Sequence, residues 1–344
     1  MRRIAVLGPA RLGDFLFTLP MLHALRRRFR AAEILYLGQP WQAVFMAARP
    51  GPPDSVVAMP PLPGIGLPAD APFDVGIRER FVARMRGLEI DVAIQAFGGG
   101  RYSNPFVAAL GARFCAGLRA TGAPPLDRTI PHAGLQNRRL QLLELAAAIG
   151  AADYRLEPEL KPTQADRDEA EDILGGLHDS PLVVLQPGAT DPRRRWPAAS
   201  FAAVGDALAG DGATIAINGT PTEAVLVHDV AAAMHASAVD LAGRLSLRGL
   251  CGLLDRAALV VSNDTGPLHL AVALGTPAVG IYWFTNLLES MPLRQQVHRA
   301  ALATRVNCPE CGVQNLELRC AHEPSFVAEV PVSRVLQLAR DLLG

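Results

Sequence analysis

The chain has 344 residues, of which half are hydrophobic, with 33 basic and 33 acidic side chains. This length predicts two domains, because one hydrophobic core rarely organises so many residues. A formal net charge of zero argues against a nucleic-acid partner, since no global field would attract a polyanion. No apolar run reaches the ~18 residues needed to cross a bilayer.

The N-terminus and the cysteine count indicate the compartment. The first residues superficially resemble a signal peptide, but Arg11 and Asp14 interrupt the apolar stretch, which favours a buried strand. Five cysteines, an odd number, fit a reducing environment better than a disulfide scaffold. We therefore expect a soluble, cytoplasmic protein. The basic residues of segment 26–30 allow at most a peripheral contact with the inner membrane face.

The first half of the chain alternates short apolar runs with helical patterns. A helix is expected over 14–29 and another over 137–149, and the Pro- and Gly-rich stretch 50–72 is expected to be a loop. This alternation predicts a parallel sheet with crossover helices, forming an N-terminal Rossmann-like domain over 1–165. The expected strands are 3–8, 33–38, 55–59, 91–97 and 113–117.

The same alternation restarts after an expected helix at 164–177. It predicts a second Rossmann-like domain over 166–330, followed by a C-terminal helical segment, 331–344, that could pack back on the N-terminal domain. The expected fold class is therefore α/β, with two doubly wound domains facing each other across a cleft. The expected strands are 182–186, 214–218, 238–241, 259–262 and 278–281, and the helices are 197–209, 222–234, 247–255, 267–274 and 333–343.

The segment 262–269, SNDTGPLH, follows an apolar strand and opens a helix. Pro267 suits the first helical position, and the free N–H groups there make an anion site. Gly266 allows a phosphate to approach the backbone, Thr265 can donate a hydroxyl hydrogen bond, and His269 could point at the same anion. The alternative is that Asp264 or Thr265 is only a helix cap and His269 a core histidine.

The segment 186–197, QPGATDPRRRWP, again joins a strand to a helix. Arg193, Arg194 and Arg195 precede a helix N-terminus and oppose its dipole, which is unfavourable unless an anion is bound there. A diphosphate would satisfy both features. The alternative is a solvated arginine loop.

Three further polar groups follow predicted strands. Asp14, in the Gly8–Asp14 segment, could be a helix cap or a general base that faces the cleft. Glu223, in the first turn of an expected helix, could bind a ribose hydroxyl or simply favour that helix. Gly98–Arg101 could let an acceptor approach the backbone.

Four segments in this order resemble glycosyltransferase family 9, the ADP-heptose:lipopolysaccharide heptosyltransferase family. The resemblance covers nearly the whole chain. The segments are RLGDFLFTLPMLHALRRRF (11–29), FGGGRYSNPFVAALGAR (97–113), PGATDPRRRWP (187–197) and SNDTGPLHLAVALGTPAVGIY (262–282).

The resemblance implies a GT-B fold and an inverting, metal-independent transfer of a sugar, most simply heptose, from an ADP-heptose-type donor. Asp14 matches the catalytic base of the family's GD motif. Arg194 stands where the family often has a phosphate-binding lysine, and this chain contains one lysine, Lys161. The other implied residues are Thr190, Asp264, Thr265, Gly266 and His269 for the donor diphosphate, Glu223 and Leu245 for the nucleoside, and Arg11, Gly13 and Arg101 for the acceptor. The acceptor hydroxyl could belong to a lipopolysaccharide core, a protein or a small molecule.

Cys308, Cys311, Cys320 and His322 could supply four ligands to a structural zinc or iron ion. A Cys-x-His pair is unusually tight for the second half of such a site, so a reduced loop is the favoured interpretation. No cofactor is expected to be required for catalysis.

Two alternatives to a transferase remain open at this stage. A GT-B-like nucleotide-sugar epimerase would need no acceptor, and a noncatalytic sugar-nucleotide-binding protein would show no transfer. A dinucleotide-dependent oxidoreductase is disfavoured because no G-x-G-x-x-G follows the first strand. A P-loop ATPase is disfavoured because no G-K-[ST] occurs.

Overall fold

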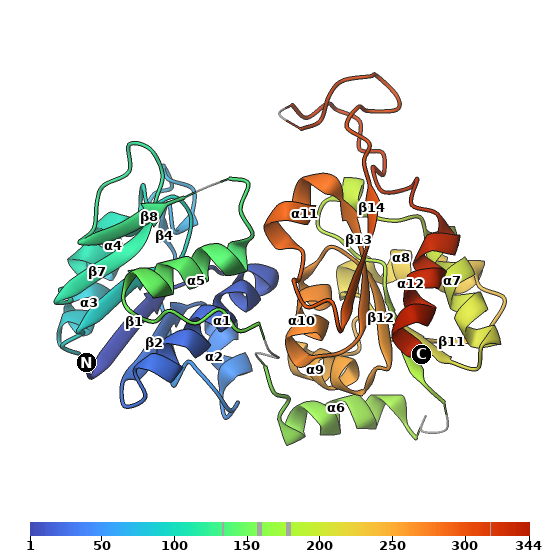
Figure 1. Cartoon of the computed structure of the whole chain (residues 1–344), viewed down its shortest axis with the longest axis horizontal. Helices are drawn as coiled ribbons and strands as arrows, with labels where there is room; N and C mark the ends of the chain where they lie inside the picture. Colours follow the sequence, from blue (N-terminus) through green and yellow to red (C-terminus); the bar gives the residue numbers. More distant parts are fainter. Residues whose placement is uncertain (133, 157–159, 177–179, 317) are drawn as a thin grey trace. The chain divides into compact units, whose positions relative to one another are not determined.

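The computed structural model of the chain divides into two compact units, Met1–Lys161 and Pro162–Gly344 (Figure 1). It describes residues 1–132, 134–156, 160–176, 180–316 and 318–344. The division differs from the expected boundary after residue 165, which would cut helix α6 (Gln164–Leu174). That helix belongs to the second unit because it packs on α9 (Leu247–Arg256), and Gly252 permits the approach: an added Cβ there would lie 1.9 Å from the Asp166 carbonyl oxygen.

The N-terminal unit is built on one six-stranded sheet in the order β3-β2-β1-β6-β7-β8, with every pair parallel. Its central strands are buried along most of their length, as expected for a parallel sheet covered on both faces. The strands are β1 (Arg3–Leu7), β2 (Glu33–Gly38), β3 (Ser55–Ala58), β6 (Val92–Gln95), β7 (Phe114–Arg119) and β8 (Arg128–Pro131), with a small pair β4 (Leu62–Pro63) and β5 (Gly66–Leu67).

Helices α1 (Leu12–Arg28) and α5 (Arg138–Ala148) of this unit pack on each other. Residues of α3 (Val75–Arg86) and α4 (Ser103–Ala109) share a hydrophobic core with the sheet. The five expected strands and both expected helices are confirmed to within a few residues. The elements α2 (Pro40–Met46), α3, α4 and β8 were not expected from the sequence, and neither was the pair β4 and β5 within the expected loop 50–72.

The C-terminal unit repeats this architecture, with strands in the order β11-β10-β9-β12-β13-β14, all parallel. The expected elements are again present, and β14 and α11 are additions. The strands are β9 (Leu182–Gln186), β10 (Thr214–Ile217), β11 (Ala238–Asp240), β12 (Leu259–Asn263), β13 (Ala278–Trp283) and β14 (His298–Ala303). The further helices are α7 (Ala198–Gly210), α8 (Ala224–Ala233), α10 (Gly266–Leu274), α11 (Phe284–Ser290) and α12 (Val332–Leu343), with 3₁₀ turns η1 (Pro192–Arg194) and η2 (Pro221–Glu223).

The last helix, α12, packs against α7 and strands of the C-terminal sheet. Its buried side chains Val335, Leu338 and Ala339 belong to the core of the C-terminal unit, which explains the arrangement. Among the residues that the structure describes, no helix combines the length and apolar character needed to span a bilayer.

Each sheet reverses its strand order at one point. In the N-terminal unit the reversal falls between β1 and β6, and in the C-terminal unit it falls between β9 and β12. Open α/β sheets bind ligands at the carboxyl ends of the strands that flank such a point. Each of the four segments that resemble the family follows one of these four strands. The strand order therefore brings two of the segments to the switch point of each sheet.

Candidate donor and acceptor sites

The turn between β12 and α10 is organised around the buried carboxylate of Asp264. His269 Nε2 lies 3.1 Å from Oδ1, Asn286 Nδ2 donates to Oδ2 at 2.9 Å, and Ser290 Oγ lies 3.2 Å from both oxygens. Arg194 from the neighbouring loop brings Nη1 to 3.5 Å from Oδ2. Asp264 is 4% exposed and His269 is 3% exposed, so both lie behind the surface of the turn.

The partners of Asp264 determine its ionisation. Burial by itself raises the pKa of this carboxyl, but the hydrogen bond from His269, the hydrogen bond from Asn286 and the charge of Arg194 together lower it below its ordinary value. Asp264 is therefore an anion at neutral pH. In this geometry its carboxylate contacts both His269 and Arg194.

The N-terminus of α10 carries no side-chain cap. Thr265 occupies the cap position, but its side chain makes no capping hydrogen bond to the helix; its hydroxyl lies 3.3 Å from the Asn263 carbonyl oxygen. Thr265 and Gly266 are half-buried, and Pro267 fills the first turn. Uncapped N–H groups at the positive end of a helix dipole favour an anion.

The three neighbouring arginines have different environments. Arg193 is engaged by Asp191, with Nη2 2.7 Å from Oδ2, and this pairing lowers the pKa of Asp191 despite its burial. Arg195 donates from Nε to the Ala189 carbonyl oxygen at 2.9 Å. Arg194 alone of the three extends to the β12–α10 turn, where its side chain is 24% exposed. Of the three arginines, Arg194 is therefore the one placed beside the N-terminus of α10.

Asn263 ties the two loops together and was not singled out in the sequence. Its Oδ1 accepts from the Trp196 backbone N–H at 3.1 Å, and its Nδ2 donates to the Pro187 carbonyl oxygen at 2.7 Å. Both of its partners are far away in sequence. This amide therefore fixes the loop after β9 against the turn after β12, directly at the switch point.

Glu223 and Leu245 lie near the loops that follow β10 and β11. Glu223 closes a capping box, because its Oε2 accepts from the Thr220 backbone N–H and hydroxyl, both at 2.9 Å. Its carboxylate also lies against Gly188, where an added Cβ would be 2.1 Å from Oε1. Leu245 is half-buried in the turn before α9, and the Gly243 backbone N–H donates to the Gly219 carbonyl oxygen at 2.8 Å. Of the two candidate nucleoside residues, Glu223 therefore lies beside the Gly188 turn.

In the N-terminal unit, Asp14 lies in the first turn of α1, and Arg11 occupies the cap position. The alternative that Asp14 caps this helix is therefore wrong. Asp14 and Gly13 are half-buried, whereas Arg11 is exposed. Thr190 in the C-terminal unit is also exposed.

Three side chains that the sequence analysis missed hold the loop before α1. Tyr36 donates its hydroxyl to the Pro9 carbonyl oxygen at 3.1 Å, Gln42 Nε2 donates to the same oxygen at 2.8 Å, and Trp41 Nε1 donates to the Ala10 carbonyl oxygen at 3.1 Å. The tyrosine ring packs so closely on Gly8 that a Cβ there would lie 1.9 Å from its hydroxyl oxygen. Only glycine fits at position 8. The contacts of the loop before α1 therefore fix where that helix begins.

The glycines 98–100 and Arg101 line a cavity of about 470 Å³ within the N-terminal unit. Arg101 is exposed at its rim, with its guanidinium 5.5 Å from the Tyr102 ring centroid. Gln95 supports the loop through a 2.7 Å hydrogen bond to Ser103 Oγ, which in turn donates to the Phe97 carbonyl oxygen. Since Leu7 and Gln95 are paired in the sheet, the loop with Asp14 and this cavity loop leave neighbouring strands.

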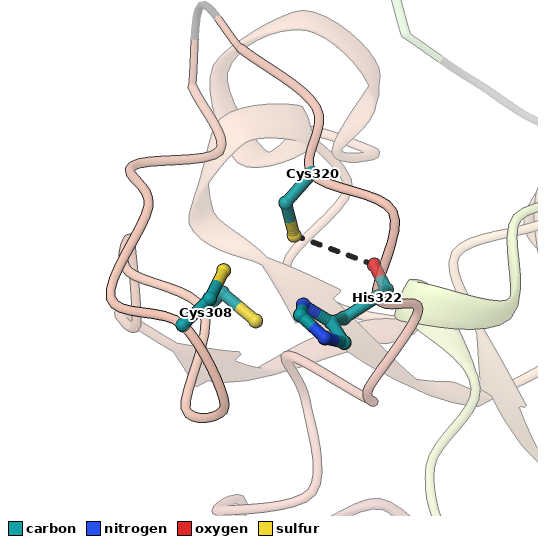
Figure 2. A group of neighbouring side chains, drawn as sticks. Cys308, Cys320 and His322 are labelled. Atoms are coloured by element: carbon teal, nitrogen blue, oxygen red, sulfur yellow. Dashed lines mark hydrogen bonds between the residues drawn. The ribbon is translucent and has the colours of Figure 1, made fainter.

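In the cysteine-containing tail, the structure brings together the four candidate metal ligands. The ligand atoms of Cys308, Cys311, Cys320 and His322 all lie within 4.8 Å of one another. Figure 2 shows Cys308, Cys320 and His322 gathered in one group. This convergence is closer than the spacing in the sequence suggested.

Two doubly wound parallel sheets in one chain, each with a switch point in its strand order, define an α/β protein of the GT-B fold class. The chain matches the family described as glycosyltransferase family 9 (heptosyltransferase) over residues 78–320, and it belongs to that family.

Relatives and solved structures agree with this assignment. The chain is 26% identical over 152 residues to lipopolysaccharide core heptosyltransferase OpsX of Haemophilus influenzae, a match covering 44% of this chain and 43% of that relative. It therefore spans less than half the length of this relative. Its fold is similar to glycosyl transferase family 9 of Veillonella parvula (TM-score 0.84, 19% identity, 99% and 97% of the two chains). It is also similar to Escherichia coli ADP-heptose lps heptosyltransferase II (TM-score 0.76, 20% identity, 100% and 98%).

Proposed function

We propose that this chain is an inverting glycosyltransferase that moves a heptose from an ADP-heptose-type donor onto a hydroxyl of a lipopolysaccharide core. The observation that carries the proposal is the uncapped N-terminus of α10 beside Arg194, at the switch point of the C-terminal sheet. The names of similar proteins, a lipopolysaccharide core heptosyltransferase and an ADP-heptose heptosyltransferase, support this choice of donor and acceptor.

In the proposed reaction the acceptor oxygen attacks the anomeric carbon, and the bond from that carbon to the diphosphate oxygen breaks. Negative charge then grows on the leaving diphosphate. Arg194, the Thr265 hydroxyl and the N–H groups of α10 stabilise this charge, so they lower the transition state more than the ground state. These protein groups supply the positive potential, and the proposal requires no catalytic cofactor.

Asp14 is the proposed base that receives the acceptor proton. Its place in the first turn of α1 lets the helix dipole favour the charged carboxylate, which weakens it as a base. Desolvation when the acceptor binds acts in the opposite direction, because it disfavours the charge. The mechanism requires the acceptor bound by the N-terminal unit to reach the sugar bound by the C-terminal unit.

The remaining assignments follow the resemblance to the family. Glu223, which lies against Gly188, would bind the ribose hydroxyls, and Leu245, in the turn before α9, would pack on the adenine. Arg11, Gly13 and Arg101 would contact the acceptor, for which the cavity at 97–103 offers space. In this proposal Asp264 and His269 are positioning residues behind the diphosphate, and Thr190 contacts the donor from the exposed side of its loop.

The test is incubation of the purified protein with a panel of nucleotide sugars, with and without heptose-deficient lipopolysaccharide. We expect nucleoside diphosphate release only with ADP-heptose and acceptor together, and an acceptor whose mass increases by one heptose. Inversion is checked by the anomeric configuration of the product. Formation of a new sugar isomer without acceptor would replace the proposal with an epimerase, and donor binding without turnover of any acceptor would contradict catalysis.

A further inference from the structure

The segment between β14 and α12 is held by hydrogen bonds around a small hairpin. Asn307 and Gln314 form an antiparallel bridge, the Cys308 backbone N–H donates to the Val313 carbonyl oxygen at 2.9 Å, and the Gly312 backbone N–H donates to the Cys308 carbonyl oxygen at 2.9 Å. Gly312 has φ +73°, a conformation that favours glycine. The turn places Cys308 and Cys311 on one side of the hairpin.

The second pair of ligands comes from the returning chain. Cys320 donates to the His322 carbonyl oxygen at 3.5 Å, and Figure 2 shows the side chains of Cys320 and His322 directed towards Cys308. The carboxylate of Glu310 lies 3.6 Å from Nε2 of His322. A histidine that binds a metal through one ring nitrogen commonly presents the other to a carboxylate.

Polar groups also face the sulfur atoms. Asn315 Nδ2 donates to Cys320 Sγ at 3.5 Å, and the Val313 backbone N–H donates to Cys311. Hydrogen bonds of this kind stabilise metal-bound thiolates. An apolar surrounding, by contrast, would favour unreactive thiols packed as small hydrophobic groups.

The separations fit a tetrahedral ion after a small contraction. Zinc bonds to sulfur at about 2.3 Å, which places neighbouring ligand atoms of a tetrahedron about 3.8 Å apart. The four ligand atoms here lie within 4.8 Å of one another without a metal to draw them in. Three cysteines and one histidine are among the ligand sets of structural zinc sites.

We propose that Cys308, Cys311, Cys320 and His322 bind one tetrahedral metal ion, and that zinc is the ion the mixed sulfur and imidazole ligands fit best. Binding requires the three thiols to lose their protons, and the fourth ligand is neutral imidazole. All four positions are filled by protein, so the ion is structural rather than catalytic.

This site would brace the arginine loop of the donor site. Asn315, which contacts Cys320, also accepts from Arg193 Nη1 through Oδ1 at 3.2 Å. The Phe326 backbone N–H donates to the Arg193 carbonyl oxygen at 2.8 Å, and Ser325 Oγ donates to the Arg195 carbonyl oxygen at 2.6 Å. Ordering the segment around the metal therefore also orders the backbone on both sides of Arg194.

The test measures zinc and iron by mass spectrometry in full-length protein purified under reducing conditions without chelators. We expect about one zinc per chain in the wild type and background levels in Cys311→Ser. The matched control is Cys115→Ser in β7, where a hydroxyl can keep the contact to the Val107 carbonyl oxygen, and it should retain the metal. One iron per chain, lost in Cys311→Ser, would support the same site with the other ion.

Two results would overturn the proposal: a wild type that takes up neither zinc nor cobalt after reduction and dialysis against each ion, or a Cys311→Ser variant with wild-type metal content. A second variant distinguishes the loss of a ligand from misfolding of the chain. His322→Cys should keep the metal, because four thiolates also form a tetrahedral site, and its cobalt form should show the visible bands of tetrahedral thiolate coordination. Loss of metal from His322→Cys together with retention in His322→Ala would contradict ligation by this side chain.

The bracing of the arginine loop has its own measurement, which is independent of transferase activity. Hydrogen exchange of backbone amides in 190–196 should accelerate several-fold when the metal is removed by a chelator, and the amides of β1 in the other unit should not change. Unchanged exchange in 190–196 after complete metal removal would refute the bracing.

Discussion

Replacing Arg194 by alanine tests the proposed diphosphate site most directly. Arg194 is the arginine of its loop that reaches the β12–α10 turn, and its side chain is 24% exposed. Asp264 keeps His269, Asn286 and Ser290 as partners when Arg194 is removed. The variant should therefore fold, and its defect should appear in catalysis.

The size of the expected decrease in kcat follows from the charge that develops on the leaving group. Loss of one preorganised donor to a developing anion costs about 2.7–4 kcal/mol, which corresponds to a decrease in kcat of about 10²–10³-fold. The half-buried position of Arg194 favours this range over the smaller effect of an exposed charge. Arg194→Lys is the matched control: it keeps the charge but loses the planar fork, so we expect a decrease of less than about tenfold.

The assay is the initial rate of ADP release with saturating ADP-heptose and acceptor, accompanied by thermal unfolding of each variant. A decrease in kcat of only a few-fold in Arg194→Ala, with unchanged unfolding temperature, would refute the role of this side chain at the diphosphate. An equal loss in the alanine and lysine variants would show that the fork geometry, rather than the charge, is required.

Three further predictions concern other parts of the site. Asp14→Asn should lower kcat by about 10²–10⁴-fold while leaving ADP affinity unchanged in calorimetry, and a parallel loss of affinity would argue against a base. Gly188→Ala should raise KM for the donor with little change in kcat, because the new Cβ displaces the carboxylate of Glu223. The control is Gly210→Ala, whose added Cβ has no atom within 4 Å, and it should behave as wild type. The native pKa of Asp264 lies below its ordinary value of 3.8, so the unfolded chain binds the proton first as the pH falls. The free energy of unfolding should therefore decrease below about pH 3.8 and level off below the native pKa. Denaturant titrations of Asp264→Asn should lack this part of the decrease. If the variant loses as much stability between neutral and acidic pH as the wild type does, Asp264 does not make this contribution.

The sequence was sufficient to predict the class of fold, because the responsible signals are local. Runs such as Ile4–Leu7 and Leu182–Leu185 are apolar over most of a buried strand, and each is followed by a turn and a helical pattern. The residue types of the segment with Thr265, Gly266 and Pro267 are enough to predict a helix start of the kind that can bind an anion. The elements that were missed, such as α2 and α4, are seven residues long and carry weak periodicity.

The tertiary structure decided which of these residues act together. Strand order, which no local pattern contains, places the loops after β9 and β12 on either side of one switch point. In the folded chain the buried carboxylate of Asp264 contacts His269 and Arg194. The side-chain amide of Asn263 joins the loops after β9 and β12 by hydrogen bonds. It also assigns α12 to the C-terminal core.

The four candidate metal ligands, Cys308, Cys311, Cys320 and His322, show the same difference between what the sequence predicts and what the folded chain decides. Their spacing along the chain allowed a metal site but made it look strained, because residues 320 and 322 are close for the second half of a usual site. The hairpin turn and the returning chain remove that difficulty by bringing all four ligand atoms together. Composition and local pattern determine which elements a chain can form, whereas the meeting of side chains distant in sequence depends on packing that only the folded molecule possesses.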